Sequence, residues 1–204
     1  MSKIGIFGGT FNPVHIGHIQ MAQYIVDNTD IDKIIFVPNG NPPHKTNKYV
    51  EDARHRYNML LLATEDNLCF EVSDYEILKS GPCYTIDTMR YFKKQNPNDT
   101  FCFIVGADSL DYIDKWMDAK NLICENEFVV IDRNFRKDYN IDKNIEYILN
   151  LGGKVTKLDM PPVDISSSRI RDMIQKGEDI QSLTGKKVKQ YILTNKLYFW
   201  RNKQ

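Results

Sequence analysis

Residues 4–18 read IGIFGGTFNPVHIGH, and this stretch decides the fold. Its first four residues are a short apolar run of the kind that forms a buried β-strand, and Gly8 and Gly9 follow directly. Glycine lets the backbone turn tightly and come close to a ligand. From Gly17 to Asn28 the chain has the length and composition of a helix, whose first N–H groups have no partner within the helix and attract anions. Strand, glycine turn and helix together predict the first unit of an α/β fold with an anion site at the turn.

The same pattern continues along the chain. Further short runs rich in β-branched or aromatic residues predict strands over 34–37, 69–72, 101–105, 128–131 and 155–158. Helix-length segments lie between them at 51–64, 85–94, 109–124 (expected to be broken) and 142–151. Several of the strands are almost continuously apolar, as strands covered on both faces of a parallel sheet must be. We therefore predict a doubly wound, mostly parallel, Rossmann-like α/β sheet of about six strands, with its ligand crevice at the carboxyl ends of the strands.

Length and composition limit the classes of protein. We expect the 204 residues to form one domain, 1–204, with a Rossmann-like core over 1–160 and a helical extension over 161–204 that has helices at 167–175 and 186–194. Lysine plus arginine and aspartate plus glutamate both number 27, so no strong field favours nucleic acid as a partner. No apolar run is long enough to cross a membrane. The four cysteines form no Cys-x-x-Cys pair, which favours a reducing cytoplasm as the location. The sequence leaves open whether the protein forms a homo-oligomer.

Two histidines close the opening stretch. His15 and His18 are three residues apart, so their imidazoles share one face if both lie in the first turn of the helix. Both then reach one phosphoryl group, where their N–H donors stabilise the charge that grows on the α-phosphate in adenylyl transfer. The alternatives are a capping and a core histidine, or half of a zinc site. The glycine pair and the preceding strand favour phosphate chemistry. No cysteine or acidic residue stands at a spacing that completes a zinc site, so we predict no metal bound by the protein.

At this point a family resemblance emerges. The pattern Gly-x-Phe-x-Pro-x-His-x-Gly-His resembles the signature of the nucleotidyltransferase superfamily. It is carried here by Gly9, Phe11, Pro13, His15, Gly17 and His18. That superfamily includes pantetheine-phosphate adenylyltransferase, cytidylyltransferases and, more remotely, class I aminoacyl-tRNA synthetases. The length of the chain excludes a synthetase with its anticodon-binding domain.

Two further segments lie next to predicted strands and helices. Past the second strand, Pro42 and Pro43 stiffen a loop and present His44 and Lys45 to the crevice, although an exposed loop lysine is the alternative for Lys45. Residues 81–88 read GPCYTIDT and lead into a helix, for which Thr85 is the expected N-cap. Capping alone explains that threonine. The same helix start also suits a carboxylate or an amide on a planar ring.

Residues 104–110 read IVGADSL and close the fourth predicted strand. Gly106 permits close approach of a nucleotide, and Asp108 is placed to accept hydrogen bonds from ribose hydroxyls. Trp116, a few residues further on, either stacks on a pyridine ring or fills the core.

The last such segment is 164–171, which reads DISSSRIR. Ser166 or Ser167 caps the helix that follows, so hydroxyls, N–H groups and the guanidinium of Arg169 converge on the β- and γ-phosphates of a nucleotide. The alternative is a capped amphipathic helix with solvated arginines.

Together these segments are similar to the bacterial nicotinate-nucleotide adenylyltransferases, from Lys3 to about Leu193. The resemblance implies an enzyme of NAD biosynthesis that joins ATP and nicotinate mononucleotide and releases pyrophosphate. The implied catalytic residues are His15, His18, Lys45 and Arg169. The implied ATP contacts are Gly8, Gly9, Thr10, Phe11, His15, His18, Gly106, Asp108, Ile165, Ser166, Ser167 and Arg169. The implied contacts with nicotinate mononucleotide are Lys45, Tyr84, Thr85, Trp116 and Arg133.

One departure from the family concerns the segment after the fifth strand, where an arginine is often followed by proline and glycine. Here it reads Arg133-Asn134-Phe135, and Arg133 is still expected near the substrate phosphate. Mg²⁺ is expected to arrive with ATP, held mainly by phosphates and water. Two alternatives stay open. In one, the adenylyl group goes to nicotinamide mononucleotide, flavin mononucleotide or phosphopantetheine instead; in the other, the protein is a nucleotide-binding sensor without catalytic activity.

Overall fold

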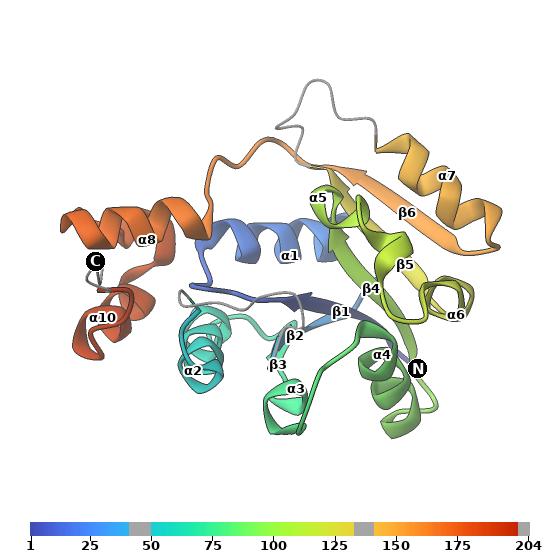
Figure 1. Cartoon of the computed structure of the whole chain (residues 1–204), viewed down its shortest axis with the longest axis horizontal. Coiled ribbons are helices and arrows are strands. Elements are labelled where there is room, and N and C mark those ends of the chain that lie inside the picture. Colours follow the sequence, from blue (N-terminus) through green and yellow to red (C-terminus); the bar gives the residue numbers. More distant parts are fainter. Residues whose placement is uncertain (41–49, 133–140, 200–204) are drawn as a thin grey trace.

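The computed structural model describes residues 1–40, 50–132 and 141–199, and within them a six-stranded parallel sheet runs in the order β3-β2-β1-β4-β5-β6 (Figure 1). Its strands are β1 (Lys3–Gly9), β2 (Lys33–Pro38), β3 (Phe70–Val72), β4 (Thr100–Gly106), β5 (Glu127–Asp132) and β6 (Lys154–Asp159). Each predicted strand is present within a residue or two of its predicted ends. The predicted α/β fold is confirmed, and the sheet is parallel throughout rather than mostly parallel.

The helices cover both faces of the sheet. They are α1 (Ile16–Asn28), α2 (Ala53–Thr64), α3 (Tyr75–Leu78), α4 (Thr85–Gln95), α5 (Ala107–Leu110), the 3-10 helix η1 (Ile113–Lys115), α6 (Ala119–Glu125), α7 (Asp142–Asn150), α8 (Ser167–Lys176), α9 (Gln181–Thr184) and α10 (Lys186–Thr194). The predicted break within 109–124 is confirmed. The four-residue helices α3 and α9 were not predicted.

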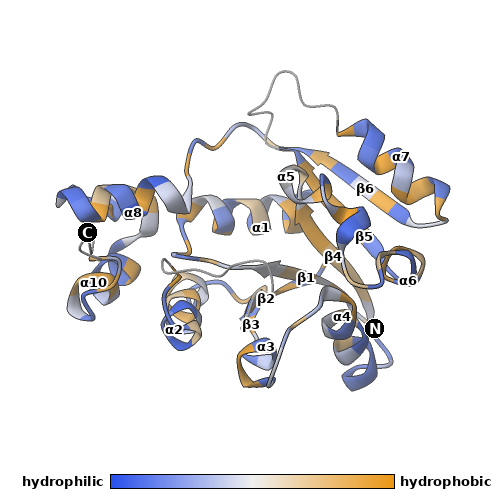
Figure 2. Ribbon diagram, in the orientation of Figure 1, coloured by the Kyte–Doolittle hydropathy of each residue, from blue (hydrophilic) through white to orange (hydrophobic). Residues whose placement is uncertain are grey.

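Alternation along the strands divides the core in two. In β2, Ile34 and Phe36 belong to the cluster that includes residues of α1, α2, α8 and α10, whereas Ile35 and Val37 belong to the cluster that includes residues of α4, α5, α6 and α7. Successive strand side chains point to opposite faces, so an unbroken apolar run supplies both clusters. Figure 2 shows β4 as mostly hydrophobic, while the edge strand β6 alternates in hydropathy and is only partly buried. No helix among the described residues is long and apolar enough to cross a membrane.

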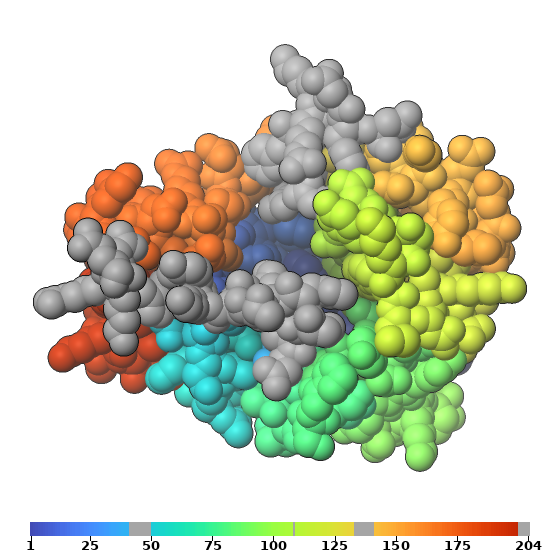
Figure 3. All heavy atoms as spheres, viewed as in Figure 1, coloured from blue at the N-terminus to red at the C-terminus, as the bar shows by residue number. Residues whose placement is uncertain are grey.

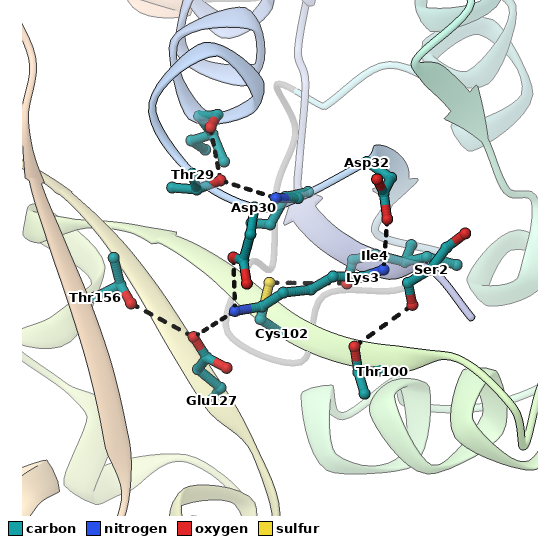
Figure 4. Close-up of polar contacts among 12 residues, drawn as sticks. Ser2, Lys3, Ile4, Thr29, Asp30, Asp32, Thr100, Cys102, Glu127 and Thr156 are labelled. Atoms are coloured by element: carbon teal, nitrogen blue, oxygen red, sulfur yellow. Dashed lines mark hydrogen bonds and ion pairs between the residues drawn. The ribbon is translucent and has the colours of Figure 1, made fainter.

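A polar cluster fastens the amino-terminal end of the sheet, away from the expected crevice (Figure 4). The Lys3 ammonium lies 3.0 Å from carboxylate oxygens of both Asp30 and Glu127, and thereby joins β1, the turn after α1, and β5. Burial of the Lys3 side chain opposes its charged form, but hydrogen bonds with the two carboxylates outweigh burial and raise its pKa. The carboxyl end of the sheet is left for the site.

Candidate active site

A cleft of about 410 Å³ opens at the carboxyl ends of β1 and β4. These strands are neighbours, and the chain winds outward in opposite directions on either side of them, which is where ligands bind in such sheets. Figure 3 shows the amino-terminal segment at the bottom of a hollow between the carboxy-terminal extension and the 107–125 region. The cleft is lined by Ile6, Phe7, Gly8, Gly9, Thr10, Phe11, His18, Met21, Asn39, Glu76, Cys83, Tyr84, Thr85, Thr88, Phe103, Ile104, Val105, Gly106, Ser109, Trp116 and Met117.

The glycine turn is shaped by the side chain of Phe11. Phe11 is buried and adopts a positive φ of 47°, which is rare for a residue with a bulky side chain. Its ring lies so close to Gly9 that a Cβ atom on Gly9 would stand 2.9 Å from the nearest ring carbon. The same ring meets His18 edge-on, with centroids 5.0 Å apart. Glycine at position 9 is therefore required for the packing that supports His18.

The two imidazoles are stacked, with ring centroids 3.7 Å apart and planes 27° from parallel. His15 is extended and occupies the N-cap of α1, one residue before the helix, whereas His18 lies in its first turn. The backbone N–H of His15 donates to Nδ1 of His18 at 3.2 Å. Because Nδ1 accepts, the ring proton of neutral His18 lies on Nε2 as a donor. His18 is half-buried and lines the cleft, while His15 is buried behind it.

Gly17 permits this stack. A Cβ atom there would stand 3.0 Å from Nδ1 of His15 and 3.4 Å from Val163. The first distance is tighter than ordinary contact, so a side chain at position 17 would press on the His15 ring. The family pattern thus has a steric cause at its second glycine as well as at Gly9.

The serine and arginine segment lies against the histidine loop. The Ser166 hydroxyl accepts from the backbone N–H of Arg169 at 3.3 Å, which makes Ser166 the N-cap of α8, one of the two residues expected there. The Ser167 hydroxyl donates to the carbonyl oxygen of Pro13 at 2.9 Å. A guanidinium nitrogen of Arg171 donates to the carbonyl oxygen of Asn12 at 2.9 Å. Two side chains of α8 therefore hold the loop that leads into His15.

Arg169 itself is exposed. Its guanidinium pairs with the carboxylate of Asp164 at 3.2 Å, and both side chains are more than half accessible to solvent. Such a surface pair contributes little stability, so a stronger anion can replace Asp164. Neither Arg169 nor Ile165, Ser166 and Ser167 is among the residues that line the described cleft.

Tyr84, Thr85, Gly106 and Trp116 also line the cleft. The N-cap of α4 is Tyr84, which is extended, and Thr85 is the first helical residue, so the prediction that Thr85 caps the helix is wrong. The helix begins at Thr85, one residue earlier than a capping Thr85 requires, because the extended residue that precedes the helix is Tyr84. Trp116 is half-buried, packs edge-on against Phe103 with ring centroids 5.8 Å apart, and also lines the cleft.

Some expected residues lie outside the described part of the chain. Lys45 and Arg133 fall in the stretches 41–49 and 133–140, and of Asp108 only the backbone, in α5, is described. Conversely, the cleft includes residues that the sequence did not single out: Asn39, Glu76, Cys83, Thr88, Ser109 and Met117.

Two charged groups are buried next to the cleft. Burial raises the pKa of the Glu76 carboxyl group, which accepts a hydrogen bond from the Thr88 hydroxyl at 2.7 Å. Burial likewise lowers the pKa of Arg56. Among the described residues, His, Cys, Asp and Glu side chains nowhere gather in a group of three that could hold a metal ion. Besides the Glu76 carboxyl group, the polar side chains that line the cleft carry hydroxyl, amide, thiol and imidazole groups, and those that can donate a hydrogen bond suit phosphate oxygens.

Comparison with known proteins extends the likeness over the whole chain. Residues 6–173 match the model of the family described as Cytidylyltransferase-like. A protein of Caldicellulosiruptor bescii named "Probable nicotinate-nucleotide adenylyltransferase" is 42% identical over 197 residues, which are 96% of this chain and 98% of that protein. The "Nicotinate-nucleotide adenylyltransferase" of Bacillus subtilis is 36% identical over 198 residues, covering 97% of this chain and 99% of the relative.

Solved structures give the same result. The nicotinic acid mononucleotide adenylyltransferase of Plasmodium falciparum in complex with NaAD superposes with a TM-score of 0.80 at 26% identity, over 98% of this chain and 99% of that one. The same protein in complex with APC gives a TM-score of 0.78 at 25% identity, over 98% and 99% of the two chains.

Proposed function

The chain belongs to the cytidylyltransferase-like family, and on that premise we propose that it is a nicotinate-nucleotide adenylyltransferase. It transfers the adenylyl group of Mg-ATP to the phosphate of nicotinate mononucleotide and gives deamido-NAD and pyrophosphate, a step of NAD biosynthesis. One observation carries the proposal from the side of the geometry. His18, Thr85 and Trp116 line a single cleft, so one cavity offers both a phosphate donor and a ring site.

ATP binds at the glycine turn. Backbone groups of Gly8, Gly9, Thr10 and Phe11 line the groove, and the N-terminus of α1 adds a partial positive charge. His18 donates from Nε2 to an oxygen of the α-phosphate, and His15 stacks behind it and fixes its ring plane. Gly106 and Asp108 are assigned to the adenosine part.

The start of α8 binds the outer phosphates. Ser166 caps the ten-residue helix α8, which begins at Ser167, and the first N–H groups of this helix suit the β- and γ-phosphates. Ile165, which precedes the cap, is assigned to the same site. Arg169 exchanges Asp164 for phosphate when ATP is present. Lys45 is assigned to the negative charge of the same phosphates.

Nicotinate mononucleotide binds in the same cleft, beside Tyr84, Thr85 and Trp116. Trp116 offers a face to the pyridine ring, and the first N–H groups of α4 at Tyr84 and Thr85 suit the ring carboxylate. Arg133 and Lys45 are assigned to the substrate phosphate.

The reaction is an in-line displacement. A phosphate oxygen of the mononucleotide forms a bond to the α-phosphorus of ATP, the bond from that phosphorus to the bridging oxygen breaks, and pyrophosphate leaves. The protein acts by positioning both substrates and by donating hydrogen bonds to the oxygens on which charge grows. Mg²⁺ enters as part of the substrate Mg-ATP, where it offsets phosphate charge. We place the reaction in the cytoplasm, where the four cysteines, none of which forms a disulfide here, stay reduced.

Pyrophosphate release from Mg-ATP tests the proposal, with nicotinate mononucleotide, nicotinamide mononucleotide and phosphopantetheine supplied in parallel. Release should be fastest with nicotinate mononucleotide, and fastest release with phosphopantetheine would sink the assignment. Replacing His18 with alanine should lower kcat by about 10²- to 10³-fold, since one transition-state donor is lost. The variant should melt as wild type does, which a circular dichroism melt checks. An active His18→Ala enzyme would remove the role of that imidazole.

A further inference from the structure

A buried arginine lies beneath the glycine turn and lines no part of the cleft. Arg56, in α2, is only 1% exposed. Its guanidinium donates to the carbonyl oxygens of Thr10 at 2.8 Å and Asn39 at 2.6 Å, and its Nε donates to the carbonyl oxygen of Glu51 at 3.0 Å. Thr10 and Asn39 both line the cleft, at the ends of neighbouring strands. The planar guanidinium group of Arg56 therefore links the ends of β1 and β2 from the buried side.

The peptide group between Asn39 and Gly40 is held at both ends. Arg56 binds its carbonyl oxygen, and the side chain of Glu76 accepts a hydrogen bond from its N–H. Glu76 is buried, lines the cleft, and accepts a second bond from the Thr88 hydroxyl. A cation at the oxygen and a carboxylate at the N–H polarise the peptide in one sense and fix its plane.

Gly40 allows this close approach. A Cβ atom at position 40 would lie 2.0 Å from the backbone carbonyl oxygen of Glu76. This overlap can be relieved only if the backbone at Gly40 or at Glu76 moves. The end of β2 and the start of α3 are thus packed backbone to backbone. The backbone N–H of Asn39 also donates to the carbonyl oxygen of Gly9 at 2.9 Å, so the held peptide is continuous with the glycine turn.

The direction of these bonds bears on the cleft. In a trans peptide the N–H points opposite to the carbonyl, so a Thr10 carbonyl fixed toward Arg56 turns the Phe11 N–H to the other side. Phe11 lines the cleft and Arg56 does not. An apolar side chain would fill the space of Arg56 without the desolvation that a buried charge costs, so stability alone is a weak reason for it.

We propose that Arg56, together with Glu76, is a positioning pair for adenylyl transfer: it holds the Thr10 and Asn39 carbonyls inward so that the glycine turn presents its N–H groups to the substrate. The inference rests on the proposed function. Arg56 touches no substrate, and its effect passes through the backbone of residues 9–11 and 39–40. A displaced turn misaligns the reacting groups after both substrates have bound, so kcat falls more than KM rises.

Two variants test this role from different sides. Arg56→Lys keeps the charge but loses the planar fork that reaches three carbonyls. Gly40→Ala keeps both buried charges and moves the peptide that they hold. Each should lower kcat by about 100-fold while KM for ATP changes by less than about threefold, measured at 20 °C on the folded protein. Ile148→Ala in α7, a buried residue remote from the cleft, is the control for lost stability and should keep kcat.

The outcomes separate the role of Arg56 from the function itself. Reduced kcat in both variants, with a cooperative melt and an unchanged Ile148→Ala, supports the proposal. A folded Gly40→Ala enzyme with kcat within about threefold of wild type overturns it, whatever Arg56→Lys does. Wild-type protein that releases no pyrophosphate from Mg-ATP and nicotinate mononucleotide would instead overturn the proposed function.

Discussion

Gly9→Ala tests the link between the glycine turn and His18 most sharply. The added methyl group would stand 2.9, 3.0 and 3.2 Å from three carbons of the Phe11 ring, whereas ordinary contact begins at 3.4 Å. The ring must therefore move by about 0.5 Å, and it is buried between Phe7, Phe36 and His18, with centroid distances of 5.6, 5.8 and 5.0 Å.

The cost follows from that overlap. Overpacking a core costs about 1–3 kcal/mol, and the stiffer unfolded chain of alanine returns about 0.4–1 kcal/mol. A net loss of about 1–2 kcal/mol lowers the melting temperature of a chain this long by roughly 3–6 °C. Pressure on the His18 ring should also lower kcat by about 10- to 100-fold, because a displacement of this size disturbs alignment.

The assay pairs thermal melts with steady-state pyrophosphate release, and Gly106→Ala is the matched control. A Cβ atom at Gly106 meets nothing within 4 Å among the described residues, so that variant should melt as wild type does; because Gly106 is assigned to the adenosine part, it should raise KM for ATP. Gly9→Ala with unchanged melting temperature and unchanged kcat would refute the claim that Phe11 supports His18.

The remaining predictions concern α8 and the thiols. Ser166→Ala removes the N-cap bond to the Arg169 N–H, so it should cost about 1 kcal/mol in a denaturant melt and raise KM for ATP, while Ser168→Ala should do neither; equal behaviour of the two would contradict the capping role. Burial raises the pKa of Cys102 to about 12, so its thiol stays protonated below that pH, and iodoacetamide at pH 8 should label exposed Cys124 in the native protein but Cys102 only after unfolding. Labelling of native Cys102, read by mass spectrometry, would contradict its burial.

Much of the fold was predictable because its strands are apolar on both faces. In β4, Phe101 to Val105 is an unbroken buried run, and such a run in alternation with helix-length segments has few other solutions. Helices α3 and α9 escaped prediction because four residues carry no periodicity of their own, and tertiary packing decides their conformation. The N-cap of α4 is Tyr84 and not Thr85 for a related reason: a local pattern does not fix the first residue of a helix to better than a residue or two.

Site residues that are close in sequence could be predicted from a local pattern. Site residues that only the tertiary fold brings together could not. His15, Gly17 and His18 are close in sequence, so one helix start brings them together. Nothing in the local sequence marks Arg56, and only the packing of α2 against β2 and β3 reveals its carbonyl partners. Arg171 likewise meets Asn12 across 159 positions of the chain, a contact that no spacing announces.

A crystal structure with a non-hydrolysable ATP analogue and nicotinate mononucleotide is the most direct test of where the chemistry occurs. We expect an α-phosphate oxygen at about 2.7–3.2 Å from Nε2 of His18, with the pyridine ring against Trp116. A triphosphate bound away from the glycine turn, or a His18 ring turned from the α-phosphate, would contradict the account.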